Sequence, residues 1–178
     1  MLHRYLAVLA CVFLGIMLLR QEQRMDRLED AVDELHQIIK TQYHIDYTKT
    51  ELDCLTRNIY YEAGNQDTLG RHAVATVTLN RLRVGRWGNT VCKVVYAPAQ
   101  FSWTLQHRLA RPDPAIYADC EVVARQALEG HRVKGLERSL MYHADYIREP
   151  FWADAKNRIG QIGRHIFYTK GLGSTIDI

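Results

Sequence analysis

The sequence predicts a small α+β domain, built from several helices followed by short strands and preceded by a separate N-terminal segment. Apolar residues recur at helical spacing between positions 50 and 129, whereas the later segments SLMYHADYI (139–147) and RHIFYT (164–169) are rich in aromatic and β-prone residues. The chain has 178 residues, 47% of them hydrophobic and 24% charged, which is typical of one globular domain. Low counts of glycine (11), proline (4) and cysteine (4) exclude a low-complexity chain or a disulfide-dense scaffold.

Residues 1–20 are predicted to anchor the chain in a membrane. Residues 5–19, YLAVLACVFLGIMLL, carry no charge, and as a helix they would cover roughly 22 Å of a hydrocarbon core about 30 Å thick. A cleaved signal peptide and a buried helix remain alternatives, although LLRQEQR offers no small-residue cleavage site after the apolar core. The arginines alone favour a cytoplasmic C-terminus, because Arg4 precedes the segment and three others follow it: Arg20, Arg24 and Arg27.

Residues 21–49 are predicted to form an amphipathic helix and a linker. Five apolar residues are spaced alternately by three and four positions, the pattern of a left-handed coiled-coil seam: Met25, Leu28, Val32, Leu35 and Ile39. Two interpretations stay open, a helix packed on its own domain and a stalk that joins copies of the chain through residues 25–39. The segment TQYHIDYTK (41–49) has no clear period and is interpreted as the linker.

Residues 50–178 form the predicted C-terminal domain, and two helices begin it. The first is expected to start at Thr50, with Asp53 completing a variant capping box, and to stop at Gly64. The second is expected to run from a Thr68 cap to Gly85. The inner faces are predicted to hold Leu52, Leu55, Ile59 and Ala63 in the first helix, and Leu69, Ala73, Val74 and Val77 in the second.

Two further helices and two strands complete the domain. Thr90 is expected to cap the short helix VCKVVY, and a fourth helix is expected from Pro114 to Glu129, with Gly130 as its stop. The fourth helix is predicted to bury Tyr117, Cys120, Val123, Ala124 and Leu128. The segments at 139–147 and 164–169 are predicted to be strands.

Three cysteines lie in this domain, and their spacing fits no zinc ribbon, zinc finger or Cys-x-x-Cys motif. Placed on helices, Cys54, Cys92 and Cys120 are interpreted as buried free thiols. A Cys54–Cys92 bond between the first and third helices is the alternative if the domain lies in an oxidising compartment.

Glu62 is the first candidate for chemistry. It falls in the last turn of a predicted helix and follows Tyr60 and Tyr61. Aromatic surroundings and the negative end of the helix dipole both raise the pKa of a carboxylic acid, and this favours a proton donor near neutral pH. Cleavage of a glycosidic bond requires such a donor. The alternative is an ordinary exposed glutamate on a helix surface.

Two other segments carry candidate binding groups. His143 and Asp145 share one face of a predicted strand, and with His165 they could bind zinc or, as we expect instead, form a polar wall beside Tyr142. The loop Gln100–Trp103 (QFSW) mixes aromatic rings with amide and hydroxyl groups, which suits sugar rings, although a buried Phe and Trp would give the same pattern.

Several activities are excluded by missing motifs and by the mild net charge. The sequence has no Gly-x-Ser-x-Gly, phosphate-binding loop or His-Glu-x-x-His, so no cofactor and no metal is expected. A net charge of +3 does not indicate a nucleic-acid partner.

Six blocks in order resemble the SleB-like cell wall hydrolases, the catalytic domain of spore cortex-lytic enzymes. They are CLTRNIYYEA from Cys54, AVATVTLNR from Ala73, TVCKVVY from Thr90, QFSW from Gln100, YHADY from Tyr142 and IGRHIFY from Ile162. The resemblance covers about residues 51–168 and implies a lysozyme-like, helix-rich α+β fold that cuts peptidoglycan glycan strands, with Glu62 at the family's catalytic glutamate. Many members continue Glu-Ala-Arg-Gly-Glu, whereas this chain continues Glu62-Ala-Gly-Asn-Gln and lacks that arginine and second acid.

The resemblance also implies a mechanism and a location. In a lytic transglycosylase, Glu62 would protonate the leaving oxygen and then take the proton of the C6 hydroxyl of N-acetylmuramic acid; lysozyme-type hydrolysis, a zinc amidase or peptidase, and a non-catalytic wall-binding scaffold are the alternatives. The substrate places the domain in the periplasm, tethered to the inner membrane, and this overrules the arginine count. A weak anchor on such an enzyme suggests a phage endolysin. The residues expected to bind substrate are Tyr61, Gln100, Phe101, Ser102, Trp103, Tyr142, His143, Asp145 and His165.

Overall fold

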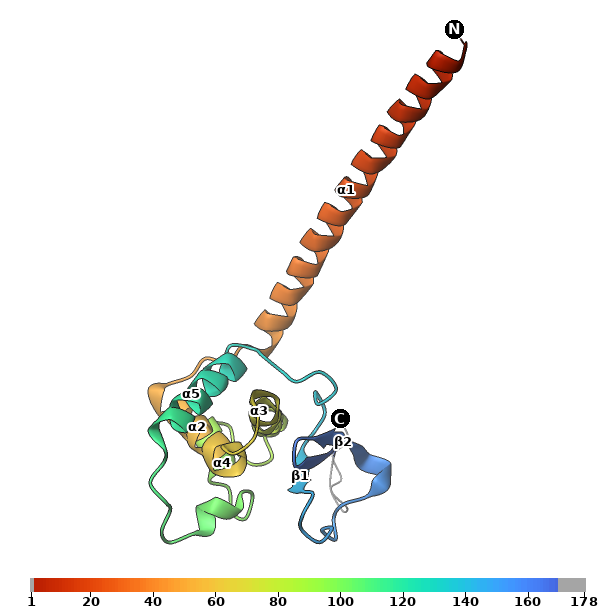
Figure 1. Cartoon of the computed structure of the whole chain (residues 1–178). Coiled ribbons are helices and arrows are strands. Elements are labelled where there is room, and N and C mark those ends of the chain that lie inside the picture. Colours follow the sequence, from red (N-terminus) through yellow and green to blue (C-terminus); the bar gives the residue numbers. More distant parts are fainter. Residues whose placement is uncertain (1, 170–178) are drawn as a thin grey trace. The chain divides into compact units, whose positions relative to one another are not determined.

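The computed structural model describes residues 2–169, with side chains described from Phe13 onward, and it divides the chain into two units, Met1–Gln42 and Tyr43–Ile178. The first unit consists of one helix, α1 (Leu2–Tyr43), which spans both the predicted anchor and the predicted stalk (Figure 1). No helix within residues 2–169 combines the length and the apolar content that crossing a membrane requires. Most side chains of the predicted anchor, residues 1–20, lie outside the described part.

The predicted seam of α1 is exposed to solvent. Its five members are between 42% and 60% exposed: Met25, Leu28, Val32, Leu35 and Ile39. The helix ends at Tyr43, so the predicted linker is shorter than residues 41–49. Part of it packs on the domain, because the backbone N–H of Ile45 donates to the carbonyl of Leu128 (2.9 Å), and Ile45 and Tyr47 contact the helical core.

The domain begins with α2 (Lys49–Ala63), whose cap differs from the prediction. Thr48, not Thr50, is the N-cap, and Glu51 rather than Asp53 completes a true capping box by accepting from the backbone N–H of Thr48. The longer glutamate side chain reaches back across the first turn, as the Thr-x-x-Glu pattern requires. The predicted stop is confirmed, since the N–H of Gly64 closes the last turn on the carbonyl of Tyr60 (2.9 Å).

The other helices are α3 (Thr68–Val84), α4 (Val91–Val95) and α5 (Pro114–Leu128). Asp67 caps α3 in place of the predicted Thr68, and Gly85 ends it with a left-handed conformation (φ 75°), as expected of a glycine there. The predicted caps of α4 at Thr90 and the predicted start of α5 at Pro114 are confirmed. Leu69, predicted to face inward, is 51% exposed.

Three short antiparallel strands form one sheet in the order β1-β3-β2: β1 (Met141–Ala144), β2 (Arg158–Ile162) and β3 (His165–Tyr168). The strands β1 and β3 confirm the prediction, whereas β2 was not predicted. A two-residue turn joins β2 to β3, and Gly163 supplies the positive φ (54°) that such a turn needs.

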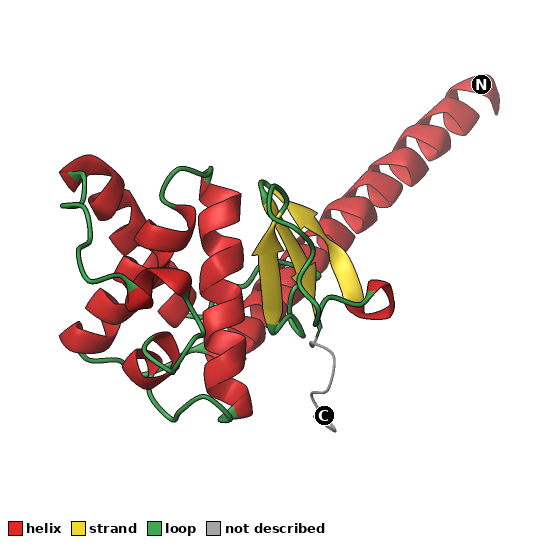
Figure 2. Ribbon diagram, turned by 90° about the horizontal axis from the view of Figure 1, so that it is seen from below, coloured by secondary structure: helices red, strands yellow, loops and turns green. Residues whose placement is uncertain are grey.

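Two clusters of buried apolar side chains hold the domain together, one between the sheet and α3 and a larger one among the helices. Figures 1 and 2 show the sheet beside the helices, and α3 supplies Ala73 and Val77 to the apolar cluster that includes Phe167 of β3. The main core lies among α2, α3, α4 and α5, around Leu55 and Ile59. The inner face predicted for α2 is therefore confirmed.

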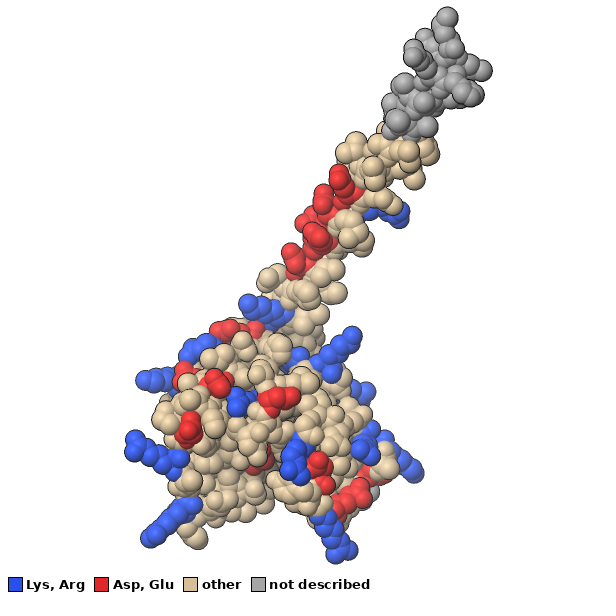
Figure 3. All heavy atoms as spheres, in the orientation of Figure 1, with Lys and Arg blue, Asp and Glu red and all other residues tan. Residues whose placement is uncertain are grey.

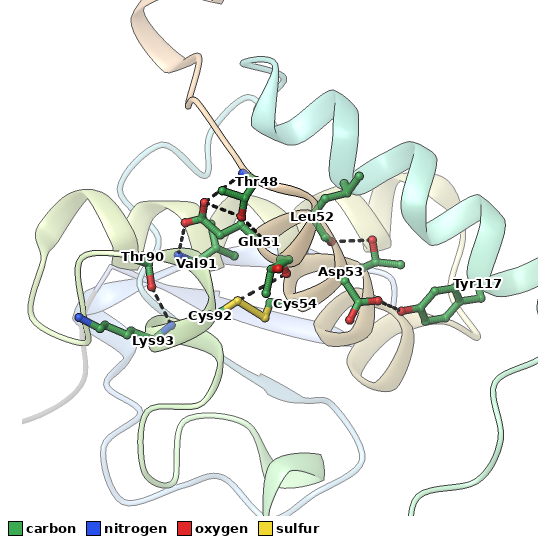
Figure 4. The surroundings of a disulfide bond; sticks show 12 residues. Thr48, Glu51, Leu52, Asp53, Cys54, Thr90, Val91, Cys92, Lys93 and Tyr117 are labelled. Atoms are coloured by element: carbon green, nitrogen blue, oxygen red, sulfur yellow. Dashed lines mark hydrogen bonds between the residues drawn. A yellow bond between two sulfur atoms is a disulfide. The ribbon is translucent and has the colours of Figure 1, made fainter.

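A disulfide joins α2 to α4, between Cys54 and Cys92, with their Cα atoms 5.3 Å apart (Figure 4). Of the two interpretations of Cys54 and Cys92, free thiols or a disulfide, the structure shows the disulfide. Next to the bond, Glu51 also accepts from the backbone N–H of Val91 (3.4 Å), so a single carboxylate contacts the N-termini of both helices. Cys120 is a buried free thiol whose pKa burial raises to about 11.

Candidate active site

Glu62 lies at the end of α2, half-buried, with the Tyr142 hydroxyl donating to its Oε2 at 3.0 Å. Burial raises the pKa of Glu62, while the hydrogen bond from Tyr142 and the positive charge of Arg81 lower it in part. The net direction is upward, so this carboxyl holds its proton to a higher pH than an exposed glutamate does. Such an arrangement suits a general acid, because the hydrogen bond from Tyr142 engages Oε2 and leaves the other oxygen to carry the proton.

Tyr142 projects from β1 and orients Glu62. Burial and the neighbouring Glu62 raise its pKa well above the usual value, so the phenol stays protonated and acts as a donor. Its ring packs against His165 and Phe167 of β3, with centroids 4.7 and 5.6 Å away. Tyr142 was predicted to bind substrate, and the structure shows a contact that the sequence did not indicate, a direct hydrogen bond to the candidate acid.

Arg81 of α3 supplies a positive charge that lowers the pKa of Glu62 in part, and it is only 3% exposed. Its Nε donates to the carbonyl of Leu140 (2.8 Å), and its guanidinium lies 5.0 Å from the ring centre of Phe101 and 5.4 Å from that of Trp87. Sequence reasoning missed this residue. The signal was present, because Arg81 follows Ala73 and Val77 at intervals of four and so continues the inner face of the helix.

His165 is buried and neutral beside the site. Burial lowers its pKa to about 4, and its Nδ1 lies 2.8 Å from the side-chain nitrogen of Gln66. Since the amide nitrogen can only donate, Nδ1 accepts and the ring proton resides on Nε2. The Gln66 oxygen accepts from the backbone N–H of Arg164 (3.0 Å), so this side chain ties the loop after Glu62 to the turn between β2 and β3. Gln66 was also missed, although it stands where the resembling family has its second acid.

The QFSW loop does not present its aromatic rings to solvent. Phe101 is 2% exposed and Trp103 is 3% exposed, and the Trp103 N–H donates to Asn58 (2.9 Å) while its ring stacks on Tyr61 (4.9 Å). The prediction that Phe101 and Trp103 contact substrate is corrected, because buried rings leave no face for a sugar. Ser102 is exposed, and Gln100 and Tyr61 are half-buried, so these three can still reach a ligand.

His143 and His165 lie on opposite faces of the sheet, since His143 pairs with Ile166 and His165 pairs with Ala144. His143 is buried, and its Nε2 lies 3.1 Å from the hydroxyl of Tyr168. Within residues 2–169, no three His, Cys, Asp or Glu side chains come together to hold a metal ion, so the zinc alternative built on these histidines is not supported. His143 also lies away from the Tyr142 face on which Glu62 is found, contrary to its predicted place in the groove wall.

Two other carboxylates that could act with Glu62 are engaged elsewhere. Asp145 pairs with Arg164 (3.2 Å) and accepts from the amide of Gln161 (3.2 Å). Asp67 accepts from the N–H of Gly70 (2.8 Å) as the cap of α3. Glu62 is therefore the carboxyl group with the clearest catalytic setting.

The family model of the Cell Wall Hydrolase domain matches residues 65–168, which is more than half of the chain. The chain belongs to the cell wall hydrolase family. Glu62 lies three residues before the matched segment, in the helix that leads into it.

Relatives and solved structures agree with this family. The chain is 30% identical over 125 residues to the spore cortex-lytic enzyme of Bacillus subtilis, and this match covers 68% of the chain and 38% of that enzyme. It is 28% identical over 125 residues to the spore cortex-lytic enzyme of Bacillus cereus, and this match covers 68% of the chain and 45% of that enzyme. This cell wall hydrolase thus spans less than half the length of these relatives. It is similar in fold to the catalytic domain of the Bacillus cereus SleB protein, with a TM-score of 0.59, 24% identity, and coverage of 69% of this chain and 92% of that one.

A second solved structure, the catalytic domain of the germination-specific lytic transglycosylase SleB from Bacillus anthracis, gives a TM-score of 0.56 at 25% identity. The match covers 68% of this chain and 96% of that one. The expectation of a helix-rich α+β domain of the SleB-like family is confirmed.

Proposed function

We propose that this cell wall hydrolase cleaves the glycan strands of peptidoglycan as a lytic transglycosylase, with Glu62 as the acid and then the base. The observation that carries the proposal is the setting of Glu62. Its pKa is governed by burial, by Tyr142 and by Arg81, and none of these is a second carboxylate. Glycosidases that retain or invert configuration generally use two carboxylates, whereas a transglycosylase needs one.

The first half of the reaction uses the protonated form of Glu62. Tyr142 holds Oε2, and the remaining oxygen gives its proton to the glycosidic oxygen as the bond from that oxygen to C1 of N-acetylmuramic acid breaks. The carboxylate that is left stands near the buried positive charge of Arg81, which stabilises it.

The second half returns the proton to Glu62. As the C6 hydroxyl oxygen attacks C1, its proton passes to the carboxylate, and the 1,6-anhydro ring closes without water. The same residue ends in the state in which it began, so no further base is required. A similar solved structure is that of a protein described as a lytic transglycosylase, and this supports the assignment of the product.

Mass spectrometry of the products of purified sacculi tests the proposal. Muropeptides that end in 1,6-anhydro-N-acetylmuramic acid support it. Reducing ends would instead indicate lysozyme-type hydrolysis, and newly freed peptides with intact glycan strands would indicate an amidase or peptidase. Binding to sacculi without any soluble product would favour the scaffold.

We further propose that the domain works in the periplasm, tethered to the inner membrane through residues 1–20. The disulfide between Cys54 and Cys92 supports export, because disulfides persist in oxidising compartments and are rare in the cytosol. Full-length protein is expected to sediment with membranes, and a protein beginning at Thr41 is expected to remain in the supernatant. Full-length protein found in the supernatant without cleavage would contradict the tether.

A role as a phage endolysin is the more specific form of this proposal. An anchor of only 15 uncharged residues is short for a membrane span, which suits a tether that is released when the membrane depolarises. Collapse of the membrane potential is then expected to move intact protein into the periplasmic fraction. Unchanged membrane association would favour a permanently tethered bacterial enzyme.

We also propose that two copies of the chain associate through residues 25–39. In this heptad frame Val32 and Ile39 occupy position a while Leu28 and Leu35 occupy position d, a combination that favours two parallel strands. Parallel pairing also sets Arg24 at position g against Glu29 at position e of the second copy, with opposite charges.

A further inference from the structure

A continuous chain of contacts leads from Glu62 to the surface of the domain. Tyr142 donates to Glu62 (3.0 Å) and packs on the ring of His165 (4.7 Å). The Nδ1 of His165 is held by Gln66 (2.8 Å), and the oxygen of Gln66 accepts from the backbone of Arg164 (3.0 Å). Every link is a hydrogen bond or a ring contact, so an unbroken series of contacts joins Arg164 to the proposed catalytic carboxyl.

The chain of contacts ends at an exposed aromatic ring, Tyr146. The guanidinium of Arg164 lies 4.7 Å from the centre of that ring, and its Nε is fixed by Asp145 (3.2 Å). The other oxygen of Asp145 accepts from the amide of Gln161 (3.2 Å). Tyr146 itself is 69% exposed, so the ring contacts the guanidinium of Arg164 while much of its surface remains open to solvent.

We propose that Tyr146 is a binding platform for a sugar ring of the glycan strand, held in place by Arg164 and Asp145. This inference rests on the proposed function, because it takes the glycan as the ligand and Glu62 as the point of cleavage. The flat apolar face of a sugar packs on an aromatic ring, and its hydroxyl groups find a donor at the edge, here the Arg164 guanidinium. Arg164 also offers a positive charge to the carboxylates of the wall peptide.

The contacts of Tyr146 favour a defined contact, and an exposed ring nearby supplies a control for non-specific adhesion. An exposed ring that is held by a cation and an ion pair loses little freedom when a ligand binds, and this favours a defined contact over non-specific adhesion. The same loop also carries Phe151, which is 88% exposed and takes no part in the contact chain. If exposed aromatic surface alone attracted the wall, Phe151 would contribute at least as much as Tyr146.

Binding of inactive protein to purified sacculi tests the proposal separately from catalysis. In full-length protein carrying Glu62→Gln, the added substitution Tyr146→Ala is expected to weaken binding by about 3- to 10-fold in sedimentation assays. Tyr146→Phe, which keeps the ring, and Phe151→Ala, the matched control, are each expected to stay within about twofold of the parent. Near-ultraviolet circular dichroism checks that each protein is folded.

Two binding results would contradict the proposed role of Tyr146. Unchanged binding by Tyr146→Ala would overturn the platform, as would equal losses from Tyr146→Ala and Phe151→Ala, because these indicate non-specific apolar adhesion. With the active protein, Tyr146→Ala should raise KM with little change in kcat, since the substitution leaves Glu62 and Tyr142 in place. A wild-type protein that binds sacculi through Tyr146 and yet cleaves nothing would refute the proposed function but not the platform.

Discussion

At the scale of single residues, burial gives Glu62 its proposed chemistry and also destabilises the fold. The folded pKa of Glu62 is raised, so the stability of the fold is highest below the unfolded pKa of a glutamate and falls as the pH rises through the folded pKa. The burial that raises the pKa of Glu62, and so suits it to donate a proton, therefore weakens the native state once the carboxyl is ionised.

Replacing Glu62 with Gln should accordingly stabilise the protein in a pH-dependent way. The melting temperature of Glu62→Gln is expected to equal that of the wild type near pH 4 and to exceed it at pH 7 to 8, because only the wild type buries a charge at the higher pH. Differential scanning calorimetry across this range measures the effect. The exposed Glu149→Gln serves as the control and should show no such trend; a wild type as stable as Glu62→Gln at pH 8 would argue against a buried, raised carboxyl.

Two buried histidines give a second test at this scale. Burial lowers the pKa of both His72 and His165 to about 4, so both stay neutral over the range in which an exposed histidine gains its proton. The ring-proton shifts of His72 and His165 are expected to stay constant in NMR spectra from pH 7.5 down to about 5. If Gln66→Ala left the shifts of His165 unaltered, the hydrogen bond that fixes its tautomer would be refuted.

At the scale of elements, local chemistry predicted most of the helices but not their contacts. Gly85 and Thr90 are recognisable because helix ends need a left-handed residue and a hydroxyl cap, both of which are local requirements. The start of α2 was placed two residues late, because Thr50 and Asp53 fit a looser form of the pattern that Thr48 and Glu51 satisfy.

Errors in the strands and in the aromatic loop have a different cause. The strand β2 was not predicted because Arg158–Ile162 contains a glycine at an irregular point of the ladder and alternates weakly. The burial of Trp103 depends on Asn58, 45 positions earlier in the chain, and no local pattern reveals such a pair. Glu62 was found from its place at a helix end, which is a local signal, whereas the contacts of Arg81 and Gln66 became evident only once helix and sheet were brought together.

The disulfide between α2 and α4 should make a large contribution to stability. It closes a loop of 38 residues, which corresponds to roughly 3 to 4 kcal/mol in the chain-entropy model. Urea unfolding of the oxidised wild type and of the Cys54→Ala, Cys92→Ala double variant should differ by this amount. Cys120→Ala is the control without a bond, and alkylation of denatured protein that is equal with and without reductant would contradict the bond.

At the scale of the whole molecule, the proposed self-association depends on the exposed apolar stripe of α1. Leu35 lies at position d of the seam and is 56% exposed, whereas Gln37 lies at position f on the opposite side of the helix. Leu35→Asp is expected to shift the protein from dimer to monomer in analytical ultracentrifugation, because it places two carboxylates in the seam. Gln37→Asp should leave the dimer intact, and a monomeric wild type at tens of micromolar would contradict the stalk.

The charges of the domain are mixed on its surface. Basic and acidic side chains are interspersed on the face of the domain that Figure 3 shows, so this face has no large patch of a single charge.

The most direct test of the central claim is release of soluble muropeptides from purified sacculi by Glu62→Gln. Gln has the size of Glu and keeps an oxygen that can accept from Tyr142, so circular dichroism and binding to sacculi are expected to be unchanged. Because the amide cannot give a proton to the leaving oxygen, release should fall by about 10²- to 10⁴-fold. Asp145→Asn, which weakens the support of Arg164 and leaves Glu62 and Tyr142 in place, should lose far less. Near-normal release by Glu62→Gln would contradict the assignment of Glu62 as the catalytic acid.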